Sequence, residues 1–189
     1  MSRVRNELKA HPGAVGAALD VRIAASAERT AHGFEFEFAL AGELAEIVWP
    51  PTVPPERADD LWKHSCFEAF CATPGAGAYY EFNFSPSGRF AVYRFGGYRE
   101  RVADPELAAA PVIAKRESGA LLVVDISIDV AGLPRLKPSA PLEFALAAVI
   151  EGRDGRVHHF ALGHPGEQPD FHDRRGFLLA LPAFGGPAA

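Results

Sequence analysis

The stretch from residue 57 to residue 99 constrains the fold most, because it contains three successive strand patterns joined by short turns. Strands are expected at residues 64–72, 79–85 and 89–96. The second turn reads Ser85-Pro86-Ser87-Gly88-Arg89. Proline presets φ at the first corner of a type I turn, and glycine supplies the left-handed residue that closes a three-residue loop. The turn therefore predicts an antiparallel hairpin in which Ser85 faces Arg89.

This register divides the side chains between two faces, because successive residues of a strand point in opposite directions. One face of the hairpin is entirely apolar or aromatic and is expected in the core: Tyr80, Phe82, Phe84, Phe90 and Val92. The other face mixes acids, amides and aromatics: Tyr79, Glu81, Asn83 and Tyr93. The preceding strand adds further residues to this second face: His64, Cys66, Glu68 and Phe70.

Two interpretations of the second face are open. The outward face of an antiparallel sheet is commonly polar simply because water covers it. A mixture of carboxylates and aromatic rings is also typical of sheet faces that bind sugars.

The remaining sequence favours an all-β fold. Fourteen phenylalanines, 16 prolines and 18 glycines, against one methionine, suit a turn-rich β protein. Further strands are expected at residues 19–26, 34–38, 44–49, 111–116, 120–128, 142–150, 157–162 and 176–181. Short helical turns are expected near residues 103–110 and, as an alternative to a loose arm, near residues 3–11. About ten or eleven strands with frequent turns predict an antiparallel two-sheet β-sandwich.

Domain organisation and location follow from length and composition. The 189 residues suit one domain over residues 1–189, with residues 1–18 as an N-terminal arm and residues 185–189 as a frayed tail. The net charge of −5 and the absence of long basic runs argue against nucleic-acid binding. No apolar run has the length of a membrane span or of a signal peptide core, so a cytoplasmic location is expected. Cys66 and Cys71 would point to opposite faces of one strand, which predicts reduced thiols.

Several motifs together resemble DOMON-like proteins related to family 9 carbohydrate-binding modules. These motifs are Leu61-Trp62, Cys66-Phe67-Glu68-Ala69-Phe70, Tyr80 to Gly88, Ala91-Val92-Tyr93, His164-Pro165 and Pro169-Asp170-Phe171-His172. The resemblance covers most of the chain. It implies a β-sandwich that binds either haem or sugars.

The sugar branch needs an aromatic platform for the apolar sugar face and planar polar groups for the hydroxyls. Trp62, Trp49 or Tyr93 can supply the platform, and the polar groups are expected from Glu68, Glu81, Asn83 and Arg57. Trp62 has the alternative role of a core plug. Arg57 has the alternative of a salt bridge with Asp59 or Asp60.

The haem branch is less well matched. Haem-binding relatives hold the iron between a methionine and a histidine, whereas the only methionine here is Met1. Ligation by two histidines stays open, with candidates at His64, His158, His159, His164 and His172. No haem or other cofactor is expected.

A long loop over residues 163–175 is the second concentration of chemical groups. His164, Asp170 and His172 are candidate walls of a ligand pocket, because long loops in compact domains are often functional. Imidazole and carboxylate groups can also bind a metal ion, but their spacing matches no zinc signature. The structural alternative is that Asp170 caps a turn and that His172 bonds to the backbone.

Three function classes are compatible with these features. The preferred one is a non-catalytic module that binds a small polar, carbohydrate-like ligand through Arg57, Trp62, His64, Glu68, Glu81, Asn83, Tyr93, His164, Asp170 and His172. The second is an enzyme that acts on sugars with Glu68 and Glu81 as paired carboxylates. The third is a module whose exposed sheet face binds another protein.

Overall fold

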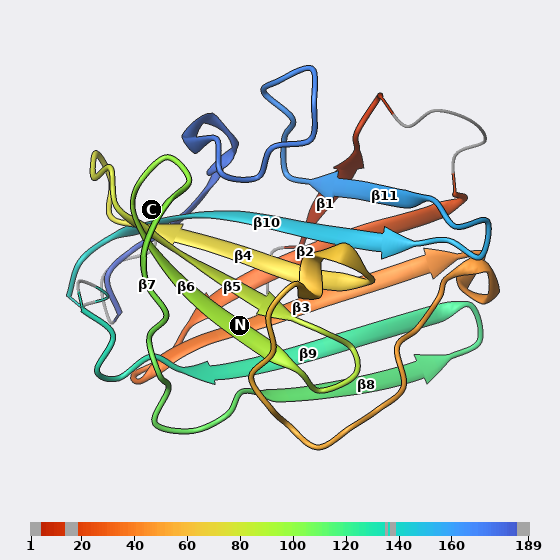
Figure 1. Ribbon diagram of the computed structural model, residues 1–189, viewed down its shortest axis with the longest axis horizontal. Coiled ribbons are helices and arrows are strands. Elements are labelled where there is room, and N and C mark those ends of the chain that lie inside the picture. Colours follow the sequence, from red (N-terminus) through yellow and green to blue (C-terminus); the bar gives the residue numbers. More distant parts are fainter. Residues whose placement is uncertain (1–4, 14–18, 135, 137–138, 185–189) are drawn as a thin grey trace.

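The computed structural model describes residues 5–13, 19–134, 136 and 139–184, and within these ranges the strands form two packed antiparallel layers (Figure 1). The first layer has the order β7-β6-β5-β4-β10-β11, and β12 pairs with β10. The second layer has the order β2-β3-β9-β8. β1 pairs with β11 of one layer and with β2 of the other, so it joins the layers along one side. The fold is a β-sandwich.

The bounds of the elements are as follows. The first layer consists of β4 (Cys66–Ala72), β5 (Tyr79–Phe84), β6 (Phe90–Gly97), β7 (Glu100–Ala103), β10 (Leu142–Glu151), β11 (Val157–Ala161) and β12 (Leu179–Leu181). The second consists of β2 (Val21–Arg29), β3 (Gly33–Gly42), β8 (Val112–Ser118) and β9 (Leu121–Asp129). The joining strand is β1 (Asn6–Ala10), and three 3-10 turns complete the described structure: η1 (Leu44–Glu46), η2 (Leu61–Lys63) and η3 (Arg174–Gly176).

Phenylalanine rings fill the space between the layers. Phe38 of β3 packs on Phe67 of β4 with 4.8 Å between ring centroids, and Phe34 meets Phe144 of β10 at 5.0 Å. Burying each such ring contributes about 1.5–3 kcal/mol relative to leaving it exposed. The described part of the chain has no helix that is long and apolar enough to cross a membrane.

The β5–β6 hairpin has the register predicted from its turn. Glu81 faces Tyr93, Phe82 faces Val92 and Phe84 faces Phe90. The amide of Ser85 donates to the carbonyl of Arg89 at 2.9 Å, and Gly88 has a φ of 106°. The apolar face of this hairpin lies in the core, as expected.

The other face of β4 and β5 is not open to water. Every residue of these two strands is buried. A second apolar cluster covers this outer face beneath the C-terminal loop and includes Phe70, Tyr79, Tyr93, Phe95 and Phe177. The interpretation of this face as plain solvated polarity is therefore wrong.

Four local predictions were also wrong. Residues 6–10, expected as a helical turn or loose arm, form β1, because Leu8 is buried between the layers. Residues 44–49 contain η1 and an isolated bridge between Ile47 and Gly152 instead of a strand. Residues 103–110 contain no helix, and β7 precedes them. Gly176 to Leu178 precede the last strand instead of belonging to it. The rest of the expected arm, and the tail at residues 185–189, lie largely outside the described residues.

Candidate functional site

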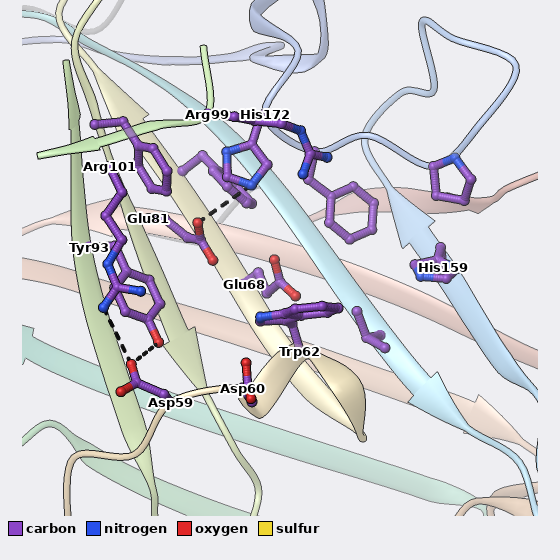
Figure 2. Close-up of a pocket in the computed structure, with 15 residues that line it drawn as sticks. Asp59, Asp60, Trp62, Glu68, Glu81, Tyr93, Arg99, Arg101, His159 and His172 are labelled. Carbon is purple, nitrogen blue, oxygen red and sulfur yellow. Dashed lines mark hydrogen bonds and ion pairs between the residues drawn. The ribbon is translucent and has the colours of Figure 1, made fainter. Parts of the chain in front are cut away.

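A cavity of about 420 Å³ lies on the outer face of the first layer, over β4, β5 and β6 (Figure 2). One wall comes from the segment that contains Asp59, Asp60 and Trp62. The opposite wall comes from the loop that contains Pro169, Phe171 and His172. The volume falls in the range of about 300–1,000 Å³ that is usual for small-molecule sites.

Two glutamates form the floor of this cavity. Glu68 of β4 faces Asn83 across the strand pair, and Glu81 of β5 faces Phe70, so the two acids are diagonal neighbours on one face. They are only 3% and 5% exposed. The side-chain amide of Asn83 donates to Oε1 of Glu81 at 2.6 Å, whereas Oε1 of Glu68 has no hydrogen-bond partner among the described residues.

Burial controls the ionisation of these two acids. Desolvation raises the pKa of Glu68 well above its ordinary value, and the neighbouring Glu81 raises it further. Desolvation also raises the pKa of Glu81, although the Asn83 hydrogen bond and the more distant charges of Arg99 and Arg101 act in the opposite direction. The pair therefore holds protons at a pH where an exposed glutamate is ionised.

His172 stands beside Glu81 on the loop side. Its Nε2 lies 3.6 Å from Oε2 of Glu81, and its Nδ1 shares a 2.8 Å hydrogen bond with the hydroxyl of Tyr79. Its ring meets Phe70 and Phe95 at centroid distances of 5.2 and 5.0 Å. Burial lowers the pKa of His172 to about 4, so the imidazole is neutral near pH 7.

Asp170 holds this loop in place. Its Oδ1 accepts from the amide of His172 at 3.1 Å and from the guanidinium of Arg99 at 2.9 Å. Its Oδ2 accepts from the hydroxyl of Tyr98 at 2.6 Å. Asp170 thus caps a turn, as the structural alternative predicted, but the imidazole of His172 bonds to Tyr79 instead of to the backbone.

Tyr93 lies at the other side of the cavity with its ring already covered. The guanidinium of Arg101 stacks over that ring at 4.1 Å from the centroid. The hydroxyl of Tyr93 donates to Oδ1 of Asp59 at 2.7 Å, and Arg57 pairs with Asp59 at 3.0 Å and with Asp104 at 3.1 Å. Tyr93 is therefore not an open aromatic platform. Arg57 does not line the cavity and instead forms salt bridges with Asp59 and Asp104.

Trp62 is the exposed aromatic ring of the site, with Nζ of Lys63 at 5.5 Å from its centroid. It lies on η2 and is 49% exposed, so it is not a core plug. Backbone hydrogen bonds hold the segment before Trp62 against the start of β6. The amide of Phe90 donates to the carbonyl of Glu56, and the amide of Ala58 donates to the carbonyl of Phe90. Trp49, by contrast, packs against the core and does not line the cavity.

The structure brings half of the expected site residues to the cavity lining. These are Trp62, Glu68, Glu81, Tyr93 and His172. Asn83, Arg57 and Asp170 each bond to a lining residue. His64 lies elsewhere and pairs with Glu151 at 2.8 Å, and His164 bonds to the carbonyl of Lys9 at 2.8 Å.

The lining also contains residues that were not among those expected to bind a sugar. Those with ionisable side chains are Asp59, Asp60, Arg99, Arg101 and His159. Arg99 has a left-handed φ of 54° at the turn into β7, a conformation that is uncommon outside glycine and has no sequence signature here. Within the described ranges, no group of three or more His, Cys, Asp or Glu side chains is arranged to hold a metal ion.

Comparison with known proteins shows a shared fold. No protein-family model matches the chain, and no curated protein matches it. A solved structure from Bacteroides uniformis, described as a candidate carbohydrate-binding protein, superposes with a TM-score of 0.70 at 14% identity, over 93% of this chain and 84% of that chain. The two chains have the same fold.

Two further matches are carbohydrate-binding modules of family 9 from Caldicellulosiruptor kristjanssonii. One, in complex with cellotriose, has a TM-score of 0.49 at 9% identity and covers 85% of this chain and 72% of that chain. The other, in complex with glucose, has a TM-score of 0.44 at 10% identity and covers 77% and 69% of the two chains. Solved structures of the family that the sequence motifs resemble are therefore among the matches.

Proposed function

We propose that this chain is a non-catalytic carbohydrate-binding module whose ligand occupies the cavity over Glu68 and Glu81. One observation carries the proposal: a half-exposed indole stands at the mouth of a cavity whose floor consists of two buried carboxylates. An indole face packs against the apolar C–H face of a pyranose, and carboxylate oxygens accept hydrogen bonds from its hydroxyls. The description of the Bacteroides uniformis protein agrees with this proposal.

A second function, glycoside hydrolysis, is favoured by one specific observation. Burial raises the pKa of both acids, but the hydrogen bond from Asn83 opposes this rise at Glu81 alone, and a pair of acids in different surroundings is typical of a catalytic acid and its partner. Glycosidase carboxylates flank the bond that they cleave, however, whereas these two lie next to each other on one floor. We therefore prefer binding, and release of nitrophenol from aryl glycosides by the wild type but not by Glu68→Gln would establish the enzyme instead.

The experiment that tests binding is calorimetric titration with a panel of mono- and oligosaccharides. Trp62→Ala removes the exposed ring without opening the core, so folding should persist while affinity falls at least tenfold, or about 1.4 kcal/mol. His64→Ala is the matched control, because His64 is also exposed but does not line the cavity. Equal affinity of the Trp62 variant and the wild type would contradict the proposal.

A further inference from the structure

The positive charges that line the cavity are already paired with aspartates. The guanidinium of Arg99 binds Asp170 at 2.9 Å. The guanidinium of Arg101 bonds to Asp104 and lies 3.5 Å from Asp59. These two arginines are the only lysine or arginine residues in the described lining of the cavity.

The two glutamates of the floor have no such partner. Among the described residues, no lysine or arginine lies within ion-pair distance of either one. The nearest basic group is Nε2 of His172, 3.6 Å from Glu81, and this imidazole is neutral near pH 7. Glu68 lines the cavity, and its Oε1 is buried and accepts no hydrogen bond from the described residues. Figure 2 shows both side chains directed into the same space between Trp62 and His172.

A ligand hydroxyl would offer this floor one hydrogen bond and no charge. A primary ammonium group offers three N–H donors and a full positive charge, and it can therefore bond to both glutamates at once. Burial raises the pKa of both glutamates, so a cation in the cavity would favour their ionised form. Hydrogen bonds between the ionised partners are then roughly twice as strong as neutral ones. The rings around the floor add to this preference, since aromatic faces attract cations.

We propose that the floor formed by Glu68 and Glu81 selects a primary ammonium group, so that the ligand is an amino sugar with a free amine. The inference rests on the proposed function and names its ligand class. Neutral sugars lack the positive charge that would favour the ionised form of the two glutamates. N-acetylated sugars lack this charge as well and carry an added acyl group.

The test is calorimetric titration of the full chain with matched sugars in one buffer at pH 7. D-glucosamine and D-galactosamine are compared with D-glucose, D-galactose and the two N-acetyl derivatives. We expect at least one amine to bind ten times more tightly than its neutral and acetylated counterparts. Glu68→Gln and Glu81→Gln should each reduce this preference at least fivefold. Glu56→Gln, at an exposed glutamate that pairs with Arg89 outside the cavity, should leave it unchanged.

The outcomes separate the inference from the proposed function. Equal or tighter binding of the neutral sugars, or a preference that survives both glutamine substitutions, overturns the ammonium subsite and leaves sugar binding intact. Binding of trans-4-aminocyclohexanol but of no sugar supports the subsite and overturns the carbohydrate proposal. If Glu68→Gln does not fold, the Glu81→Gln variant and the comparison of sugars on the wild type still show whether the floor selects an ammonium group.

Discussion

At the scale of single residues, the chemistry of the site follows from two carboxylates that the fold buries without a cation. The opposite face of the same strands fills the core, so folding itself does not demand acids at these positions. Each acid keeps a desolvation cost that a suitable ligand can offset. Stability and binding should therefore respond in opposite directions when a charge is removed.

Glu81→Gln tests this opposition. The substitution keeps the shape of the side chain and an oxygen that can accept from Asn83, but it removes a buried acid that a bound cation would ionise. We expect the free energy of unfolding to be unchanged or higher and the ligand affinity to fall by about 1.5–3 kcal/mol, as for the loss of a hydrogen bond to a charged group. Chemical denaturation and calorimetry measure the two quantities. A large loss of stability with unchanged affinity would instead identify Glu81 as part of the scaffold.

His172 should make stability depend on pH. Because its folded pKa of about 4 is below its unfolded value, the unfolded chain binds a proton from pH 6.5 downward while the folded chain stays neutral until about pH 4. This residue's contribution is therefore lost as the pH falls from 6.5 to 4, by at most about 3.4 kcal/mol. Glu68 and Glu81 act in the opposite direction, since their raised pKa values favour the folded chain as the pH falls.

Comparison of the wild type with His172→Gln separates the contribution of the histidine to the pH dependence of stability from that of Glu68 and Glu81. Between pH 7 and pH 4 the wild type should lose more unfolding free energy than the variant, when both are measured by urea denaturation at each pH. Parallel pH profiles would show that His172 is not buried as a neutral ring.

At the scale of elements, the hairpin was predictable because its turn residues and its alternation agree. Proline and glycine at fixed offsets set the turn, and the alternation then decides which side chains share a face. β1 was missed because a five-residue strand with one buried side chain carries almost no pattern. The positions of Asp60 and Arg99 depend on left-handed backbone at non-glycine residues, which propensity does not indicate.

Gly88→Val tests the hairpin turn. The residue has a φ of 106°, and an added Cβ would lie 2.8 Å from the carbonyl oxygen of Val53. The left-handed backbone alone should cost about 1–2 kcal/mol, and displacement of the adjoining loop should add to this. Gly119→Val is the control, because Gly119 has a φ of 59° in a hairpin turn with no atom near its Cβ position. If thermal unfolding shows equal losses in the two variants, Gly88 does not touch that loop.

At the scale of the whole molecule, the sandwich follows from strand count and alternation, but the cavity does not. The sequence placed Glu68, Glu81 and Asn83 on one face, and that face does form the floor. The covering of this face depends on contacts between distant segments, such as Asp170 with Arg99 and Glu56 with Phe90. His64 was misassigned because it precedes β4 and therefore does not follow the alternation of that strand.

The same overall arrangement leads us to expect no haem binding. Met1 is the only methionine, and the two histidines that line the cavity, His159 and His172, stand on different walls. Addition of haemin in equal amount to the purified protein should therefore give no sharp low-spin Soret band. Such a band, abolished by substitution of His172, would restore the haem branch.

The central claim, that a saccharide occupies the cavity over the two glutamates, is tested most directly by a crystal structure of the chain with the saccharide that binds most tightly in solution. We predict electron density for a pyranose ring against Trp62, with polar groups of the ligand within hydrogen-bond distance of Glu68 and Glu81. Density at another surface, such as the groove beside β8 lined by Glu35, Val112 and Asp125, with only water over the glutamates, would contradict the account.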